Sequence, residues 1–154
     1  MIQRAPAVLL FRGRGFISAS IRWQTRSPYS HAALLYPDGK TIIEAWQFRG
    51  VQKREVIDWE GIEVFEAPNL DAWRWEQIFH FAESKIGKRY DYRGVLRFLS
   101  RIPASTDDAW FCSELVFAAF QSAGWNLLHE TTAGAVSPAM LALSPLLWKA
   151  DIPF

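Results

Sequence analysis

Asp38 and Gly39 separate two short apolar runs, His31–Tyr36 and Thr41–Trp46, and this turn constrains the fold more than any other feature of the chain. An Asp-Gly pair between such runs favours a hairpin, because both residues tolerate the positive φ angles of a two-residue loop. We therefore predict two antiparallel strands joined at this turn. A fixed turn also fixes the strand register, and with it the side chains that share a face.

Further strand-like runs surround this hairpin. Ala7–Phe11 has the length and composition of a short buried strand, and Val51–Ile57 and Ile62–Ala67 are two more candidates. Phe16–Gln24, between a Gly-rich turn and a Ser-Pro break, fits one or two helical turns. The first part of the chain is therefore expected to consist mainly of strands.

A first long helix is predicted after these strands. Asn69 or Asp71 can cap its start, and Gly87 supplies a C-terminal stop. Its apolar positions recur at helical spacing: Trp75, Ile78, Phe79, Ala82 and Ile86.

A second long helix is predicted from about Asp108 to Ser122 or Ala123, with Asp107 or Asp108 as its cap and Gly124 as its stop. Its apolar stripe consists of Cys112, Leu115, Val116, Ala119 and Ala123. The single cysteine of the chain is therefore expected to face the interior near the start of a helix.

Strands followed by helices indicate an α+β fold, and 154 residues leave room for one domain, residues 1–154. Met140–Trp148, after Ser137-Pro138, is expected to form a packed, partly helical tail. We expect no transmembrane segment, because no apolar stretch approaches the ~18 residues that a membrane helix needs. Ala5–Phe11 is too short for a signal peptide, so the default expectation is a cytoplasmic protein, with delivery outside the cell by an unencoded route left open.

Charge is unevenly distributed along the chain, although the formal net charge is only +1. Basic residues dominate the first third and acidic residues the remainder. The simplest interpretation is that the two parts interleave and neutralise each other, and a basic binding face is the alternative. Because nucleic-acid binding would rest on that face alone, we expect no nucleic-acid partner.

Cys112 is the only cysteine, which excludes an intrachain disulfide, a CxxC redox pair and a multi-cysteine zinc site. The three histidines lack ligand spacing, so we expect no metal and no other cofactor. At the start of a helix, unpaired backbone N–H groups and the positive end of the dipole favour a nucleophilic thiolate. The alternative is a buried cysteine that packs as a small apolar side chain.

Catalysis by a thiol needs an imidazole base and a polar group that orients the ring. His80 lies inside the first long helix and His129 follows a helix end, so we interpret both as structural or surface residues. His31 begins a strand and lies opposite Trp46 in the predicted hairpin. In that register His31 and Glu44 are diagonal neighbours on one face, within reach of a hydrogen bond. The alternative for Glu44 is a solvated strand carboxylate.

Five motifs follow one another in a characteristic order. They are Tyr29-Ser30-His31-Ala32-Ala33-Leu34, Ile43-Glu44-Ala45, Gly87-Lys88-Arg89-Tyr90-Asp91-Tyr92, Trp110-Phe111-Cys112-Ser113-Glu114-Leu115-Val116 and Ser137-Pro138. They resemble the Ser-His strand, the Glu strand, the Gly-x-x-Tyr-Asp segment, the Cys helix and the closing motif of the circularly permuted papain-like branch of the NlpC-type superfamily, especially its YiiX-like members. The resemblance extends from Ala7 to about Leu141.

The resemblance implies a permuted papain-like fold of the α+β class, in which an antiparallel sheet or small barrel packs against helices and the cysteine lies at a helix N-terminus. It implies Cys112 as the nucleophile, His31 as the general base and later acid, and Glu44 as the group that orients the imidazole. An oxyanion hole would need the Cys112 backbone N–H and a second donor. Tyr29 and Tyr90 are the candidates for that donor or for substrate binding, and a packed strand residue is the alternative for Tyr90.

Three functions remain open at this point. The leading hypothesis is a cysteine amidase or peptidase that cleaves peptides or cell-wall peptides, such as those of peptidoglycan, through a thioester acyl-enzyme. The second is hydrolysis or transfer of lipid or ester acyl groups, although the Asn-Cys-Glu-His context of lecithin retinol acyltransferase-like relatives is absent. The third is a catalytically silent module that binds peptide or glycan through residues such as Trp23 and Trp46, and the intact set of Cys112, His31 and Glu44 argues against it.

Overall fold

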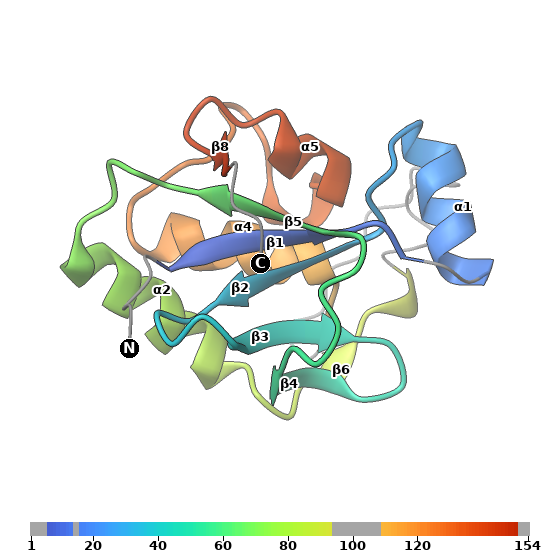
Figure 1. Ribbon diagram of the computed structural model, residues 1–154, viewed down its shortest axis with the longest axis horizontal. Helices are drawn as coiled ribbons and strands as arrows, with labels where there is room; N and C mark the ends of the chain where they lie inside the picture. Colours follow the sequence, from blue (N-terminus) through green and yellow to red (C-terminus); the bar gives the residue numbers. More distant parts are fainter. Residues whose placement is uncertain (1–5, 14–15, 94–108, 151–154) are drawn as a thin grey trace.

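The computed structural model describes residues 6–13, 16–93 and 109–150, with only the backbone for residues 16–18, 20 and 24. Six strands form one curled antiparallel sheet in the order β4-β3-β2-β1-β5-β8 (Figure 1). The strands are β1 (Ala7–Phe11), β2 (His31–Leu35), β3 (Thr41–Trp46), β4 (Gly50–Glu55), β5 (Ile62–Glu66) and β8 (Trp148–Lys149). Each strand is short, and the central ones consist almost entirely of apolar residues, as expected for strands that are buried on both faces.

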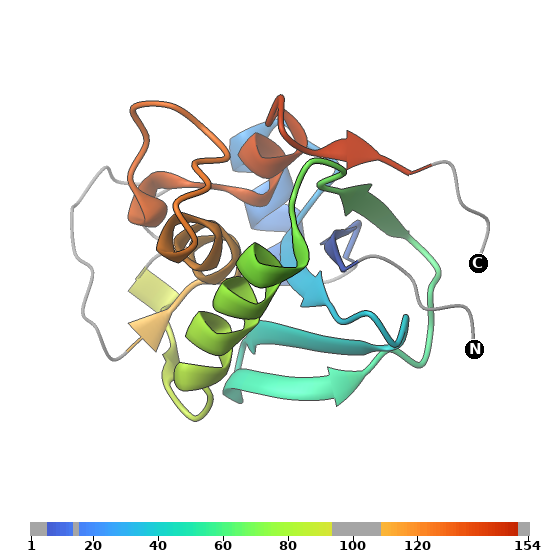
Figure 2. The ribbon, with the colours of Figure 1, turned by 90° about the vertical axis from the view of Figure 1, so that its left-hand side faces the viewer.

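The helices cover one face and one end of this sheet. They are α1 (Phe16–Thr25), α2 (Ala72–Ser84), α4 (Cys112–Ser122) and α5 (Pro138–Ala142), with a 3₁₀ turn at Ala133–Ala135. Figure 2 shows α2 and α4 side by side against the sheet, and α4 contacts both β2 and β3. The α1 helix lies where β1 ends and β2 begins (Figure 1). No helix within the described residues is both long and apolar enough to cross a bilayer.

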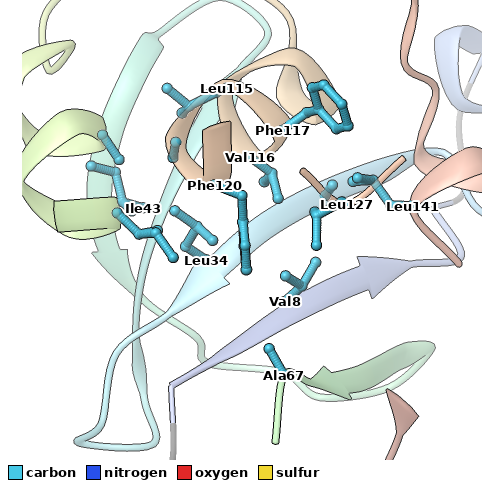
Figure 3. Close-up of a cluster of buried hydrophobic side chains, with 14 of the residues drawn as sticks. Val8, Leu34, Ile43, Ala67, Leu115, Val116, Phe117, Phe120, Leu127 and Leu141 are labelled. Atoms are coloured by element: carbon cyan, nitrogen blue, oxygen red, sulfur yellow. The ribbon is translucent and has the colours of Figure 1, made fainter. Parts of the chain in front are cut away.

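The main core lies between the sheet and the two longest helices. Figure 3 shows Phe117 and Phe120 of α4 among side chains from the strands, including Val8, Leu34 and Ile43. Because successive strand residues point to opposite faces, the alternate residues form a second cluster on the other side of the sheet. That cluster contains Ala7, Leu9, Ala33, Leu35, Ile42, Val56 and Val64. Truncation of one such core aromatic to Ala typically costs about 3–5 kcal/mol, so this packing fixes the positions of β2, β3 and α4.

The register predicted for the hairpin is confirmed, because Leu34 pairs with Ile43 and Leu35 with Ile42. The loop itself differs from the prediction. Only Gly39 has a positive φ, of 71°. The strands close one residue pair earlier, where the Tyr36 N–H donates to the Thr41 carbonyl at 2.9 Å. A four-residue loop preserves the register because the same residues stay opposed.

Two helix boundaries also differ from the prediction. The α2 helix begins after its cap Asp71, as expected, but it ends at Ser84, so Ile86 lies outside it and is 47% exposed. The α4 helix begins at Cys112 and not near Asp108, because Ala109–Trp110 is extended as β7 and pairs in parallel with β6 (Arg89–Tyr90). Asp107 and Asp108 lie outside the described residues.

The helix stripe, the tail and the charge distribution agree with the sequence-based expectations. The stripe predicted for the second helix is buried from Cys112 to Ala123. In the tail, the Ser137 hydroxyl caps α5 by accepting from the Met140 N–H. The basic and acidic parts of the chain interleave through ion pairs such as Lys53–Glu83 and Arg12–Glu63.

Candidate active site

Cys112 is the first residue of α4, directly after an extended Phe111 with φ −88° and ψ 154°. Glu114, in the first helical turn, accepts a hydrogen bond from the Phe111 N–H at 3.2 Å and fixes the entry into the helix. The backbone N–H groups of a first helical turn have no partner within the helix, and they carry the positive end of its dipole. This position favours negative charge on the Cys112 sulfur.

His31 is the first residue of β2, and its imidazole bridges two elements. Its Nε2 lies 2.7 Å from Oε2 of Glu44, and the Cys112 side chain is close enough to the ring to raise the pKa of His31. Two aromatic edges hold the ring, from Phe11 at 5.0 Å and from Trp46 at 4.9 Å between ring centroids. The imidazole is therefore fixed between a thiol and a carboxylate.

The protonation of His31 follows from these contacts. Burial alone disfavours the imidazolium, but the Cys112 thiolate and the Glu44 carboxylate favour it more strongly and raise the pKa of His31 to about 9. The contacts of His31 thus favour the charged form of its imidazole.

Glu44 is fully buried and is held by residues of the neighbouring strand. Gln52 lies opposite it in β4 and donates to Oε1 at 3.1 Å. Arg54 donates to both carboxylate oxygens, from Nε at 2.6 Å and from Nη2 at 3.3 Å. Burial by itself would raise the pKa of Glu44, but the hydrogen bond and charge of His31, followed by those of Arg54, lower it to about 2. Glu44 is therefore a buried ionised carboxylate and not a solvated one.

Neither Gln52 nor Arg54 was predicted from the sequence. The signal that could have found them is the β3–β4 hairpin, because its register places Gln52 beside Glu44. That hairpin turns at Gln47–Arg49, which carries no Asn-Gly or Asp-Gly pair.

The Cys112 side chain is covered. Cys112 is 1% exposed and packs with Ile21 of α1 and with Phe111, while Tyr90 packs against the same cluster. Ile21 was not a sequence candidate, because α1 is far from α4 in the chain and nothing local indicates the contact. Ile21, Phe111 and Tyr90 therefore shield the sulfur from solvent.

The two tyrosine candidates lie in different environments. Tyr90 adjoins the cluster around Cys112, with its ring 5.9 Å from that of Phe111. Burial, and then the negative charge of the Cys112 thiolate, raise the pKa of Tyr90, so its hydroxyl remains a donor. Tyr29 instead donates its hydroxyl to Glu63, and burial together with that carboxylate raises its pKa to about 12. No described contact brings the Tyr29 hydroxyl to Cys112.

His80 and His129 are both exposed, in agreement with their interpretation as surface residues. Within the described residues, no three His, Cys, Asp or Glu side chains converge in a way that could hold a metal ion.

Comparison with known proteins gives a match in structure only. The sequence matches no protein-family model and no curated protein. The crystal structure of metalloprotein yiiX from Escherichia coli O157:H7, DUF1105, superimposes with a TM-score of 0.77 at 19% sequence identity, over 100% of this chain and 99% of that chain. The chain has the YiiX fold. The predicted α+β class and the YiiX-like resemblance are thus confirmed at the level of the fold.

Proposed function

We propose that this protein is a cysteine-dependent amidase or peptidase that cleaves amide bonds of peptides, including cell-wall peptides, through a thioester acyl-enzyme. The observation that carries the proposal is the buried His31 imidazole, which lies 2.7 Å from the Glu44 carboxylate and interacts electrostatically with Cys112. Each of these groups alone has an ordinary structural explanation, but together they are the set that thiol catalysis needs. In the chain, His31 and Glu44 precede Cys112, and this order also supports assignment to the permuted papain-like enzymes.

The geometry suggests a role for each group. The Cys112 sulfur transfers its proton to His31 and attacks the substrate carbonyl carbon, and the developing oxyanion is stabilised at the start of α4. The Cys112 N–H is one donor there, and the protonated Tyr90 hydroxyl is the candidate for the second. His31 then protonates the leaving amine, which releases it and leaves the acyl group on sulfur.

The second half of the reaction uses the same groups. A water molecule gives a proton to His31 and attacks the thioester carbonyl, which returns the sulfur and releases the acid. Glu44 is a positioning residue, because it acts through the imidazole. Its charge stabilises the imidazolium, and its hydrogen bond holds the ring in the tautomer that leaves Nδ1 for the sulfur.

The same groups would also support hydrolysis or transfer of lipid or ester acyl groups, and a silent binding module would use none of them. One experiment separates these alternatives. The wild type and Cys112→Ala are incubated with a panel of peptidoglycan fragments, dipeptides and acyl esters, and products are identified by mass spectrometry. His80→Ala, which changes an exposed histidine of α2, is the matched control.

We expect the wild type and His80→Ala to release amine products from peptides, and Cys112→Ala to release none. Products from esters alone would favour the lipid or ester alternative. An absence of products from the whole panel would contradict the proposed hydrolase and favour the silent module.

A further inference from the structure

A cavity of about 570 Å³ adjoins the candidate active site. It is lined by Phe48, Arg89, Tyr90, Asp91, Tyr92, Arg93 and Ala109. Two contacts connect it to the proposed chemistry. Tyr90 packs against the cluster that contains Cys112. Trp46, which contacts the His31 ring, belongs to the strand that leads into the turn carrying Phe48.

The walls of this cavity are fixed to each other. The Phe48 N–H donates to the Tyr92 hydroxyl at 2.7 Å, and the Val51 N–H donates to the Lys88 carbonyl at 2.9 Å. Gly50, with φ 74°, allows the closest approach, because a Cβ there would lie 2.1 Å from the Lys88 carbonyl oxygen. The β3–β4 turn and the segment around β6 therefore form a preorganised wall.

Phe48 lies on this wall in a strained backbone conformation. Its φ is 68°, in the left-handed region that bulky residues rarely adopt, and its side chain is 83% exposed. A glycine or asparagine would fit this turn with less strain, and a polar residue would suit the solvent better. Strain held in place beside a cavity points to a role in binding.

Two cationic side chains, those of Arg89 and Arg93, also line the cavity. Exposed lysines elsewhere, such as Lys40 and Lys53, form ion pairs with carboxylates. Among the described residues, neither Arg89 nor Arg93 forms a side-chain hydrogen bond or an ion pair. Among the described residues of the lining, the one carboxylate is that of Asp91, which is buried. Two guanidinium groups thus outnumber the one carboxylate among the described lining residues.

We propose that this cavity is the subsite for a carboxylate-bearing segment of the peptide substrate, with Arg89 and Arg93 binding the carboxylate and Phe48 packing on an adjacent apolar side chain. The inference rests on the proposed function, which accounts for a peptide at this place. Guanidinium groups match a carboxylate in geometry and charge, and an exposed aromatic ring supplies apolar contact area at little entropic cost.

Binding is measured on the full-length Cys112→Ala protein, which cannot form an acyl-enzyme. The probes are acetyl-Phe-Glu-Ala-amide and its counterpart acetyl-Phe-Gln-Ala-amide, which differ only in the charge of one side chain, and affinities are obtained by NMR titration. We expect the Glu peptide to bind about tenfold tighter or better, as for a hydrogen bond to a charged group. Arg89→Gln with Arg93→Gln abolishes this preference, whereas Arg49→Gln, an exposed arginine of the same turn outside the lining, preserves it.

Phe48→Asn separates binding from stability. Because Asn tolerates a positive φ, we expect the melting temperature to stay the same or to rise while the affinity for both peptides falls several-fold. A lower melting temperature with unchanged affinity would assign Phe48 a structural role and overturn its place in the subsite.

The outcomes distinguish this inference from the proposed function. Equal binding of the Glu and Gln peptides, or a preference unaffected by the double arginine variant, would overturn the subsite, while peptide turnover by the wild type would still support the hydrolase. Binding of the Glu peptide that depends on both arginines, without turnover of any panel compound, would support the subsite and contradict the hydrolase.

Discussion

Nε2 of His31 lies 2.7 Å from Oε2 of Glu44, and both side chains are buried between strands that are adjacent in the sheet. The two residues are diagonal neighbours across the β2–β3 pair, so their contact depends on the strand register. Burial shields the pair from bulk solvent, and the protonation of the imidazole therefore depends on its immediate neighbours.

Glu44→Gln tests the electrostatic part of this contact. The amide keeps the shape but removes the negative charge that favours the imidazolium, so the pKa of His31 should fall from about 9. Turnover should fall as well, though less than in Cys112→Ala, because Glu44 acts through the imidazole. An NMR titration of His31 in both proteins measures the shift. Identical pKa values with identical turnover would mean that another group orients the ring.

The pH dependence of stability follows from the same two groups. The pKa of His31 is raised from 6.5 to about 9, so its contribution is complete below pH 6.5 and is lost as the pH rises toward 9. The pKa of Glu44 is lowered from 4.5 to about 2, so its contribution is complete above pH 4.5 and is lost as the pH falls toward 2. Both contributions are complete between pH 4.5 and pH 6.5. We therefore expect urea denaturation to give the greatest free energy of unfolding in this range. In His31→Gln the loss above pH 6.5 should become smaller, and an unchanged alkaline profile would exclude His31 as its source.

Arg54→Ala tests the support of Glu44. The substitution removes both guanidinium hydrogen bonds to the buried Glu44 carboxylate, and this loss should lower the free energy of unfolding by about 1–3 kcal/mol. The pKa of Glu44 should rise from about 2. Lys53→Ala is the matched control, because its ion pair with Glu83 lies on the surface and should contribute about 0–1 kcal/mol. Equal losses of stability in the two variants would show that Arg54 adds no more than a surface ion pair.

Ile21→Ala tests the cover over the sulfur. Removal of this side chain from α1 opens a path to Cys112, so alkylation by iodoacetamide should become several-fold faster at pH 7. Ile78→Ala, on the buried face of α2 in the main core, removes the same atoms from a site away from Cys112 and controls for loss of stability. Equal acceleration in both variants would attribute the effect to general unfolding.

The hairpin shows how much of the site could be predicted from the sequence. Two apolar runs and one Asp-Gly turn were enough to place Leu34 opposite Ile43, and the same register brings His31 and Glu44 onto one face. The prediction succeeded although the loop type was wrong, because the register depends on which residues face each other and not on the φ angle of Asp38.

The parts that could not be predicted depend on contacts between distant segments. The start of α4 was placed too early, because the pairing of β7 with β6 overrides the capping tendency of the two aspartates before it. The contact of Ile21 with Cys112 and the left-handed conformation of Phe48 likewise depend on tertiary packing. Local sequence patterns carry no information on such contacts.

The central claim is that Cys112 carries the acyl group, and intact-mass spectrometry after rapid acid quench tests it most directly. With a peptide of the panel that the wild type cleaves, we predict a transient adduct with the mass of the acyl group, mapped by proteolysis to the peptide that contains Cys112. Cys112→Ala should form no adduct, and His31→Ala should form it at least about 10²-fold more slowly, as expected for loss of a general base. Cleavage by the wild type without an adduct, at a rate unchanged in Cys112→Ala, would contradict the account.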